Sequence, residues 1–415
     1  MSQKKYSIPR ITIPMRDLFL LLASTMTIMA GATLAPALPG MREAFAAQDN
    51  AELWVKLILA IPGLCIAICA PVIGLLIDRW HKKNTLAIAL LICGIAGSIG
   101  YLLNDSLMTI LISRMILGVA VAGIMVSCIT LAGDYFSGSA LGRYMGLQAA
   151  FGSFGGVFFL AIAGFLAEIN WTMPFLIYLF ALLLLPGCLF FLKEPSTKVI
   201  SRSENITGEP PNLPRNKILL CYALAVFEML ILYLVPLHFP FFIQQLHNAA
   251  EPTYINFSSA SIIGASIAAM LLVSAIVSLN YRAYSQRFSL QGLHTLGLII
   301  VALGLLGLAL ANHYWLALLG LILMGIGIGI IRPNLIVWLF SFTPETMRGR
   351  IAGGITSCFF IGQILCPLLT QPLITKLGYS LVYALTGVIT LILAGLLSLM
   401  FSRQWSKTTP AIHSP

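Results

Sequence analysis

The chain has 415 residues, of which 59% are hydrophobic and only 9% are charged, and its mean hydropathy is +0.95. Because a soluble domain carries about 25% charged residues, this composition excludes a soluble enzyme, a disordered chain and a nucleic-acid-binding module. The formal net charge of +10 comes mostly from lysine and arginine in the segments between the predicted spans. This distribution is typical of a membrane protein, so no nucleic-acid partner is expected. The composition predicts a polytopic membrane protein embedded in the lipid bilayer.

Apolar runs predict twelve membrane-spanning helices along the chain. A bilayer core takes about 20 apolar residues per helix, and lipid offers the backbone no hydrogen-bond partner, so the spans must be helical. The predicted spans are 17–38, 53–77, 84–104, 107–134, 140–167, 173–193, 217–243, 257–280, 291–312, 316–341, 350–375 and 378–401. All eight cysteines fall inside these runs, where neither a disulfide framework nor a zinc site is expected, so we predict no cofactor and no metal.

Lysine and arginine are distributed unevenly between the two sides of these spans. With an even number of spans both termini lie on one side, and most of the 24 basic residues fall there. Only Arg42, Lys56 and Lys376 are assigned to the opposite side, while Arg114 and Arg332 lie inside spans. The positive-inside rule therefore predicts cytoplasmic termini, and we expect a multi-pass protein of the inner (cytoplasmic) membrane.

One long polar segment divides the chain into halves with six spans each. Residues 195–216 are rich in proline and polar side chains, which favours a flexible linker. We predict an N-terminal six-helix bundle over 1–194, a cytoplasmic linker over 195–216 and a C-terminal six-helix bundle over 217–415. The halves look weakly repeated, because Gly142–Gly146 aligns with Gly349–Gly353, although chance also produces such glycine matches. Repeated halves with a binding site between them are typical of secondary transporters.

A motif of glycine, acid and base lies between the second and third spans. Its residues are Gly74, Asp78, Arg79, Lys82 and Lys83. A glycine permits close helix packing in lipid, and an acid at a helix end can pair with a base or cap a neighbouring helix. With the twelve spans and the central linker, the motif resembles the pattern Gly-x-x-x-Asp-Arg-x-Gly-Arg-Arg of the major facilitator superfamily, from which it departs at His81. The resemblance implies an all-α fold of two pseudo-symmetric six-helix bundles, in which this loop gates the conformational change.

Further motifs resemble those of the drug/proton antiporters in this superfamily. Arg114 and Gly118 match an Arg-x-x-x-Gly motif in the fourth span. A charge at that depth is costly and is usually functional or paired, so Arg114 is a candidate for proton coupling, with a purely structural cation as the alternative. Asp134 and Arg143 flank the next loop and resemble a family pattern that would close the inner gate, or they are ordinary interfacial charges. The fifth span has Val157 where the antiporter motif has proline, which leaves the direction of transport open.

Two ionisable residues lie near the predicted midplane. Glu228 is about 16 Å from the inner end of the seventh span, and Arg332 is about 14 Å from the inner end of the tenth. Their matched depth permits an ion pair, and alternation between that pair and a protonated Glu228 would couple protons to transport; a static pair is the alternative. The residues expected to bind substrate are Arg114, Glu228, Arg332, Tyr233, Asn334, Trp338 and Gln363. His238 is either a titrating group or a solvated interface residue.

These observations favour a secondary active transporter. Our main hypothesis is proton-coupled export of small amphipathic molecules by alternating access, and the alternative is an uptake symporter for an organic metabolite or a siderophore-like anion. An intramembrane enzyme or a receptor is the third possibility. No phosphate-binding loop motif is present, so the sequence gives no support for an ATP-driven pump, and we predict that the protein is not an enzyme. The expected partners are a small-molecule substrate, protons and the bilayer, and we expect a monomer.

Overall fold

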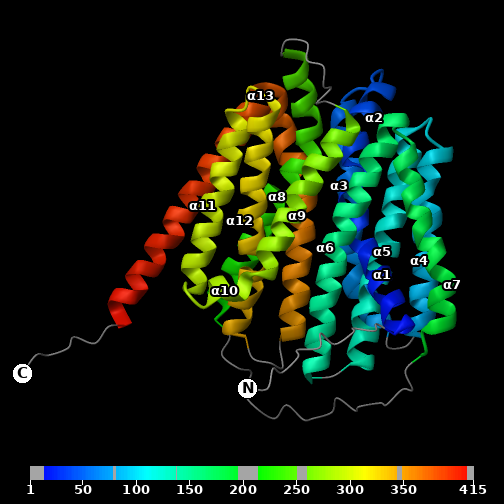
Figure 1. The fold of residues 1–415 in the computed structure, drawn as a ribbon, viewed down its shortest axis with the longest axis horizontal. Helices are drawn as coiled ribbons and strands as arrows, with labels where there is room; N and C mark the ends of the chain where they lie inside the picture. The colour runs from blue at the N-terminus through cyan, green and yellow to red at the C-terminus, as the bar shows by residue number, and fades with distance from the viewer. Residues whose placement is uncertain are drawn as a thin grey trace, which may run out of the picture.

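The computed structural model describes residues 14–77, 81–136, 138–194, 214–249, 259–343 and 348–408, and these residues form helices and no strands. The elements are α1 (Met15–Ala32), η1 (Ala35–Ala37), α2 (Leu38–Ala44), α3 (Ala51–Leu76), α4 (Lys82–Leu102), α5 (Leu107–Tyr135), α6 (Gly138–Ile169), η2 (Met173–Leu179), α7 (Phe180–Phe191), α8 (Arg215–Ala249), α9 (Ala260–Leu279), α10 (Tyr281–Ser285), α11 (Leu290–Ala309), α12 (Tyr314–Ser341) and α13 (Arg348–Thr408). The long helices run up and down, roughly alongside one another, in one bundle (Figure 1).

The predicted spans correspond to these helices. Within the described residues, eleven helices are long and apolar enough to cross a membrane, and the last of them, Ile351–Met400, has 50 residues. One crossing takes about 20 residues, so this segment holds two. The chain reverses at Gly378, where φ is +80°, a conformation that only glycine adopts without strain. The twelve predicted spans are therefore confirmed.

Two predicted boundaries were wrong. The first run, 17–38, is not one continuous helix, because α1 ends at Ala32 and the chain continues through η1 into α2. Pro36 and Pro39 lack the amide hydrogen that a continuous helix needs, which explains the break. The predicted linker is also too long at its end, because α8 begins at Arg215. The rest of the linker, from 195 to 213, lies outside the described residues.

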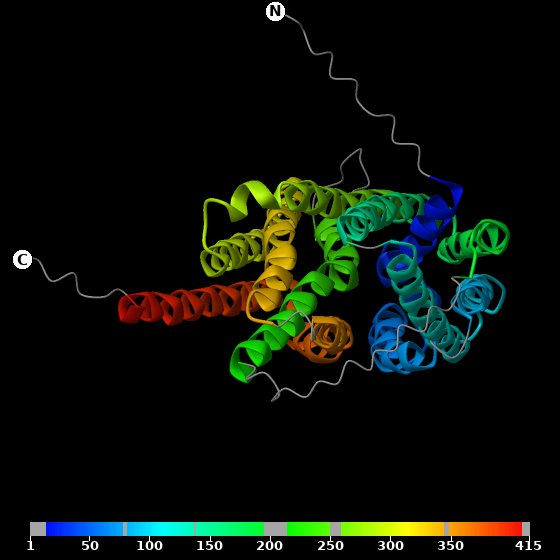
Figure 2. The same ribbon diagram turned by 90° about the horizontal axis from the view of Figure 1, so that it is seen from below.

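The helices form two groups that lie side by side. Seen from below, α1–α7 occupy one side and α8–α13 the other (Figure 2). The groups meet where α6 packs against α9 and α3 packs against α13. At the first of these contacts a Cβ on Gly164 would lie 2.7 Å from the carbonyl oxygen of Ala260, and one on Gly264 would lie 2.9 Å from the Cα of Gly164. The two backbones therefore touch, as small residues allow between membrane helices.

The two ends of the bundle are told apart by the residues that lie there. The terminal end is where α1 begins at Met15, and the far end is where α13 reverses at Gly378 (Figure 1). Large apolar side chains cover the outside between these ends, for example Phe190, which is 83% exposed, and Leu75, which is 79% exposed. A surface of this kind is stable only against lipid, which agrees with a membrane-embedded protein.

Candidate functional site

A cavity of about 330 Å³ lies between the two helix groups. Helices α1, α3 and α6 line it from one side, and α8, α9, α12 and α13 line it from the other. Most of its wall is apolar, and the lining residues with polar side chains are Thr27, Ser153, Tyr233, Ser274, Ser278, Arg332 and Gln363. Arg332 is the single charged side chain among these described lining residues. A mostly apolar cavity with a few polar groups suits a small amphipathic molecule.

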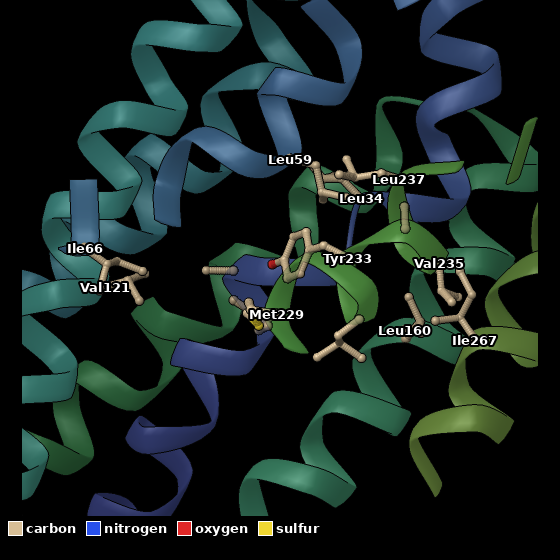
Figure 3. Packing of buried hydrophobic residues seen from close by; sticks show 14 of the residues in the cluster. Leu34, Leu59, Ile66, Val121, Leu160, Met229, Tyr233, Val235, Leu237 and Ile267 are labelled. Atoms are coloured by element: carbon tan, nitrogen blue, oxygen red, sulfur yellow. The ribbon is translucent and has the colours of Figure 1, made fainter. Parts of the chain in front are cut away.

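Residues of α8 contact helices of both groups at the level of the cavity. Figure 3 shows Leu160 of α6 and Ile267 of α9 next to Val235 of α8. Tyr233, two residues earlier on α8, donates a hydrogen bond of 2.7 Å from its Oη to the carbonyl oxygen of Gly31 on α1. Gln363 of α13 donates a longer bond, 3.4 Å, to a carbonyl of α3. Both cavity residues therefore bridge the two groups in this conformation.

Arg332 points into the cavity from α12. Its guanidinium carbon lies 4.7 Å from the centre of the Phe359 ring, and its Nη2 lies 3.9 Å from the sulfur of Met229. Glu228 and Arg332 form no ion pair in this conformation. The reason is the helix period, because consecutive residues of α8 point about 100° apart. Met229 therefore faces the cavity, while Glu228 faces the interior of its own helix group.

Glu228 instead lies beside a histidine that the sequence analysis did not single out. Its Oε1 is 3.5 Å from Nε2 of His294 on α11, and the two residues are 3% and 1% exposed. Neither carboxylate oxygen and neither ring nitrogen has a hydrogen-bond partner. A buried ionisable pair without other partners is costly in lipid and is a candidate functional site. His294 stands near the start of an apolar run, and no pattern in the sequence shows which way it points.

Three polar or aromatic groups extend this pair toward the terminal end. The ring of Trp338 on α12 lies 5.6 Å from the His294 ring. Asn334 is fully buried, and its Nδ2 donates a hydrogen bond of 2.7 Å to the carbonyl oxygen of Leu290, which lies one turn before His294. Its Oδ1 accepts a 2.9 Å bond from the hydroxyl of half-buried Tyr281. Asn334 and Trp338, which the sequence placed in the cavity, therefore lie behind it.

Arg114 lies outside the cavity. Its Nη2 donates to the carbonyl oxygens of Ala96 and Gly97 on α4, and its guanidinium carbon lies 4.8 Å from the ring centres of both Phe175 and Tyr178. No carboxylate of the described residues pairs with it. These contacts match the structural alternative for this conformation, because carbonyl oxygens and aromatic faces stabilise a buried cation. A coupling role for Arg114 stays a prediction.

A cluster of buried and half-buried residues, most of them polar, joins the two groups at the far end. Lys56 of α3 lies at the end opposite to the start of α1, the side to which the sequence assigned it, but its side chain has no exposed surface. Its Nζ donates to Glu52 and, at 2.6 Å, to Oε1 of Gln371 on α13. The hydroxyl of Tyr379 donates to Glu52 at 2.6 Å, and the lysine nitrogen lies 4.6 Å from the centre of the Phe241 ring. Lys56, Glu52, Gln371, Tyr379 and Phe241 are called the far-end cluster below.

His238 lies near the far-end cluster and is fully buried. Its Nε2 is 2.7 Å from the hydroxyl of Thr370, and its ring is 6.2 Å from that of Tyr379. The possibility of a solvated interface histidine was therefore wrong. The helix α8 extends to Ala249, six residues beyond the predicted span end at 243, which places His238 deeper than the sequence indicated.

The predicted gating motif is only partly described. Asp78 and Arg79 lie outside the described residues, and so does the side chain of Arg143. Lys82 Nζ pairs with Asp134 Oδ2 at 2.7 Å, so these two predicted gate residues do come together. Both belong to α1–α7, and the pair is exposed. The start of α4 is held by Glu194, whose carboxylate accepts the backbone amides of Lys82 and Lys83 at 2.7 and 2.9 Å.

Three glycines near the terminal end have open space beside them. A Cβ built on Gly74 of α3, on Gly146 of α6 or on Gly353 of α13 would meet no atom within 4 Å. Within the described residues, the hydrogen bonds between α1–α7 and α8–α13 join residues in the middle or at the far end. Among the described residues, the two groups are therefore hydrogen-bonded to each other at the far end and in the middle, and not at the terminal end.

These features agree with the comparisons to known proteins. The family model of the Major Facilitator Superfamily matches residues 20–277 and 241–412, and the chain belongs to this superfamily. It is 23% identical over 410 residues to the class H tetracycline resistance protein of Pasteurella multocida, covering 95% of this chain and 97% of that protein. It is 26% identical over 351 residues to the class C tetracycline resistance protein of Escherichia coli, covering 80% of this chain and 83% of that one.

Solved structures share the fold. A D-xylose–proton symporter superposes with a TM-score of 0.75 at 16% identity, covering 91% of this chain and 96% of that one. A bacterial homologue of the human lysosomal transporter Spinster, in an inward-facing and occupied conformation, superposes with a TM-score of 0.72 at 16% identity, covering 95% and 98%. The protein is a secondary transporter of the membrane and is not an enzyme.

Proposed function

We propose that this transporter exports small amphipathic molecules in exchange for protons. The observation that carries the proposal is the position of Glu228, which is buried directly behind the cavity wall while its neighbour Met229 forms part of that wall. A carboxylate in this place can take up and release a proton without occupying the substrate's volume. The tetracycline resistance proteins among the relatives give independent support for export.

The charges of Glu228 and Arg332 supply the coupling. With Glu228 ionised, the cavity region is close to neutral overall, and a neutral or cationic amphipathic molecule can bind. Protonation of Glu228 leaves the positive charge of Arg332 uncompensated, which repels a cation and weakens its binding. Because such linkage is reciprocal, bound substrate also favours loss of the proton, and the two exchange.

The closed far end fits the loading step of an exporter. The positive-inside rule assigns the terminal end to the cytoplasm, so a cavity closed at the far end takes its substrate from the cytoplasmic side. Release then requires opening of the far-end cluster and closure of the terminal end, where Gly74 and the gating motif lie. Alternation between the two is the expected transport cycle.

Arg332 also favours a second candidate function. An organic anion would bind Arg332 best when Glu228 is protonated and no longer attracts the guanidinium, so proton and anion would bind together. That arrangement is a proton symporter for an anionic metabolite. In this cavity a cationic substrate would therefore exchange with a proton, and an anionic substrate would travel together with one.

The test uses the purified protein in liposomes with an imposed pH gradient and a pH-sensitive dye inside. Tetracycline, a lipophilic cation and an organic anion are added in turn, and the same liposomes without protein are the control. Proton movement opposite to tetracycline or to the cation supports exchange. Proton movement together with the anion, and none with the other two, overturns export and supports the symporter.

A further inference from the structure

We infer that Glu228 and His294 together form the proton site, and that the proton leaves it toward the terminal end through water beside Asn334 and Tyr281. The inference rests on the proposed function and adds a second residue and a route to it. Its starting point is geometric, because the two side chains lie 3.5 Å apart on α8 and α11, and each is almost completely buried.

The pair is built to hold one proton. Both oxygens of Glu228 and both ring nitrogens of His294 lack hydrogen-bond partners, so nothing else satisfies them. A pair with one proton is neutral overall, whether the proton sits on the carboxyl oxygen or on the imidazole nitrogen. A neutral pair brings no net charge of its own into the lipid, so the single-proton state is the one expected in the absence of substrate.

Loss of the proton connects this pair to the cavity. In the first step the O–H bond at Glu228 Oε1 breaks and an N–H bond forms at His294 Nε2, so the pair becomes carboxylate and imidazolium. In the second step Nδ1 of His294 gives up its proton to a water molecule on the side away from Glu228. The remaining carboxylate is then compensated by Arg332, the cation on the cavity side. When the proton leaves, the carboxylate of Glu228 thus compensates the positive charge of Arg332 as substrate is taken up.

Other groups near the pair come from α8 and α12. Arg332 of α12 and the thiol of Cys221, two turns earlier on α8, both interact electrostatically with Glu228. Trp338 lies against the histidine ring, and its indole carries no charge near neutral pH. His294 is the nearest titratable partner and the one that can carry a proton onward.

The route continues through polar groups on the terminal side. Asn334 bonds the carbonyl oxygen of Leu290, which lies one turn, about 6 Å, before His294 along α11. Tyr281 bonds the same asparagine, and its helix α10 lies at the terminal end (Figure 1). Tyr281 is half-buried, so these polar groups lie between the buried pair and the surface, within α8–α13 and separately from the cavity. An amide does not carry a proton near neutral pH, so water beside Asn334 and Tyr281 is the carrier in this proposal.

The test measures the proton directly and needs no substrate. Infrared difference spectra of the protein in lipid are recorded during pH titration, and the C=O stretch of a protonated carboxyl group is followed. We expect one band that titrates reversibly, that is absent in Glu228→Gln, and whose midpoint moves by about one pH unit or more in His294→Gln. His247→Gln, a change at the far end of α8, is the matched control and leaves the midpoint unchanged.

Kinetics test the route. After a pH jump, Tyr281→Phe slows the change of the band at least severalfold and leaves its midpoint in place, because it removes a hydroxyl from the route and leaves the pair intact. His294→Asn is the second variant if His294→Gln does not fold, as judged by its elution volume and helical circular dichroism.

The outcomes separate the two proposals. A band that disappears in Glu228→Gln but keeps its midpoint in both histidine variants overturns the role of His294 and leaves proton-coupled export standing. Absence of any titrating band that depends on Glu228 overturns the proton site and the coupling mechanism together. An unchanged rate in Tyr281→Phe overturns the route.

Discussion

Lys56 and Gln371 lie 315 residues apart in the chain, yet the ammonium group of one donates a 2.6 Å hydrogen bond to the amide oxygen of the other. The bond joins α3 to α13, and so joins the two helix groups at the far end. Lys56 is fully buried and has Glu52 as its ionic partner. A buried charge held in this way specifies one arrangement of the two groups, because separation exposes or isolates it.

We expect Lys56→Met to weaken closure of the far end. The change leaves Glu52 without its ionic partner, and breaking a buried pair on one side typically costs about 3–5 kcal/mol. Part of that cost is avoided if the far end opens to water, so the closed population falls. Hydrogen exchange of α2 and of residues 371–379 should become faster. Tyr379→Phe removes only one bond to Glu52 and should have a smaller effect; equal exchange in both variants and wild type would contradict the role of the cluster.

Glu228→Gln should abolish the dependence of transport on the pH gradient without unfolding the protein. Glutamine has nearly the same shape but binds no proton, so substrate still exchanges down its own gradient. The measurement is flux of tetracycline into liposomes with and without a pH difference. Asp105→Asn, in an exposed loop, is the control and should behave as wild type. Wild-type pH dependence of transport in Glu228→Gln would contradict the role of Glu228 in proton coupling.

Arg332→Gln should separate ligands by charge. It removes the single cation among the described cavity-lining residues, so affinity for an organic anion should fall at least about tenfold, which is about 1.4 kcal/mol. Affinity for a lipophilic cation should stay the same or rise. Arg332→Lys keeps the charge and is the matched control. Equilibrium binding to the purified protein measures both, and equal losses for anion and cation would show that Arg332 acts by shape alone.

Gly164→Ala should shift the protein away from the conformation described here. A Cβ at this position would lie 2.7 Å from a backbone carbonyl oxygen of α9, which cannot move aside as a side chain can. Gly395→Ala adds the same methyl group where no atom lies within 4 Å, and should change nothing. Hydrogen exchange at the far end reports the shift, and protection equal to wild type in Gly164→Ala would argue against tight closure there.

Asp78→Asn should reduce the transport rate more than substrate affinity, because the gating motif acts on the conformational change. Asp134→Asn removes the exposed pair with Lys82, and pairs of this kind contribute about 0.2–1 kcal/mol, so its effect on stability should be small. Initial rates in liposomes and equilibrium binding are measured for both variants. An unchanged rate in Asp78→Asn would remove the gating role of this residue.

The sequence predicted the number of spans and the depth of the charges, but not the faces on which they lie. Apolar length alone identifies a span, and counting residues along a helix gives an expected depth; Arg332 does contact Met229, the residue after Glu228. Helices buried in lipid and protein are apolar all round, so little amphipathic signal shows which neighbour a side chain meets. That is why Glu228 was expected to face Arg332 and not His294.

Lys56 illustrates the same limit at a helix end. A lysine three residues inside a predicted span resembles one that extends to the interface, and only tertiary contacts decide between the two. Its partners Gln371 and Phe241 come from the other helix group, so no local pattern reveals them. Of the seven residues expected to bind substrate, Arg332, Tyr233 and Gln363 line the cavity.

The reversal at Gly378 makes the far end sensitive to the surrounding lipid. A single residue joins the last two spans there, and Tyr379, which holds Glu52, is the first residue after it. The last span faces the bilayer with large apolar side chains such as Ile392 and Leu399. Because no loop absorbs its motion, a change in membrane thickness that tilts this span acts on Tyr379 directly. The rate at which the far end opens is therefore expected to depend on the acyl-chain length of the host membrane.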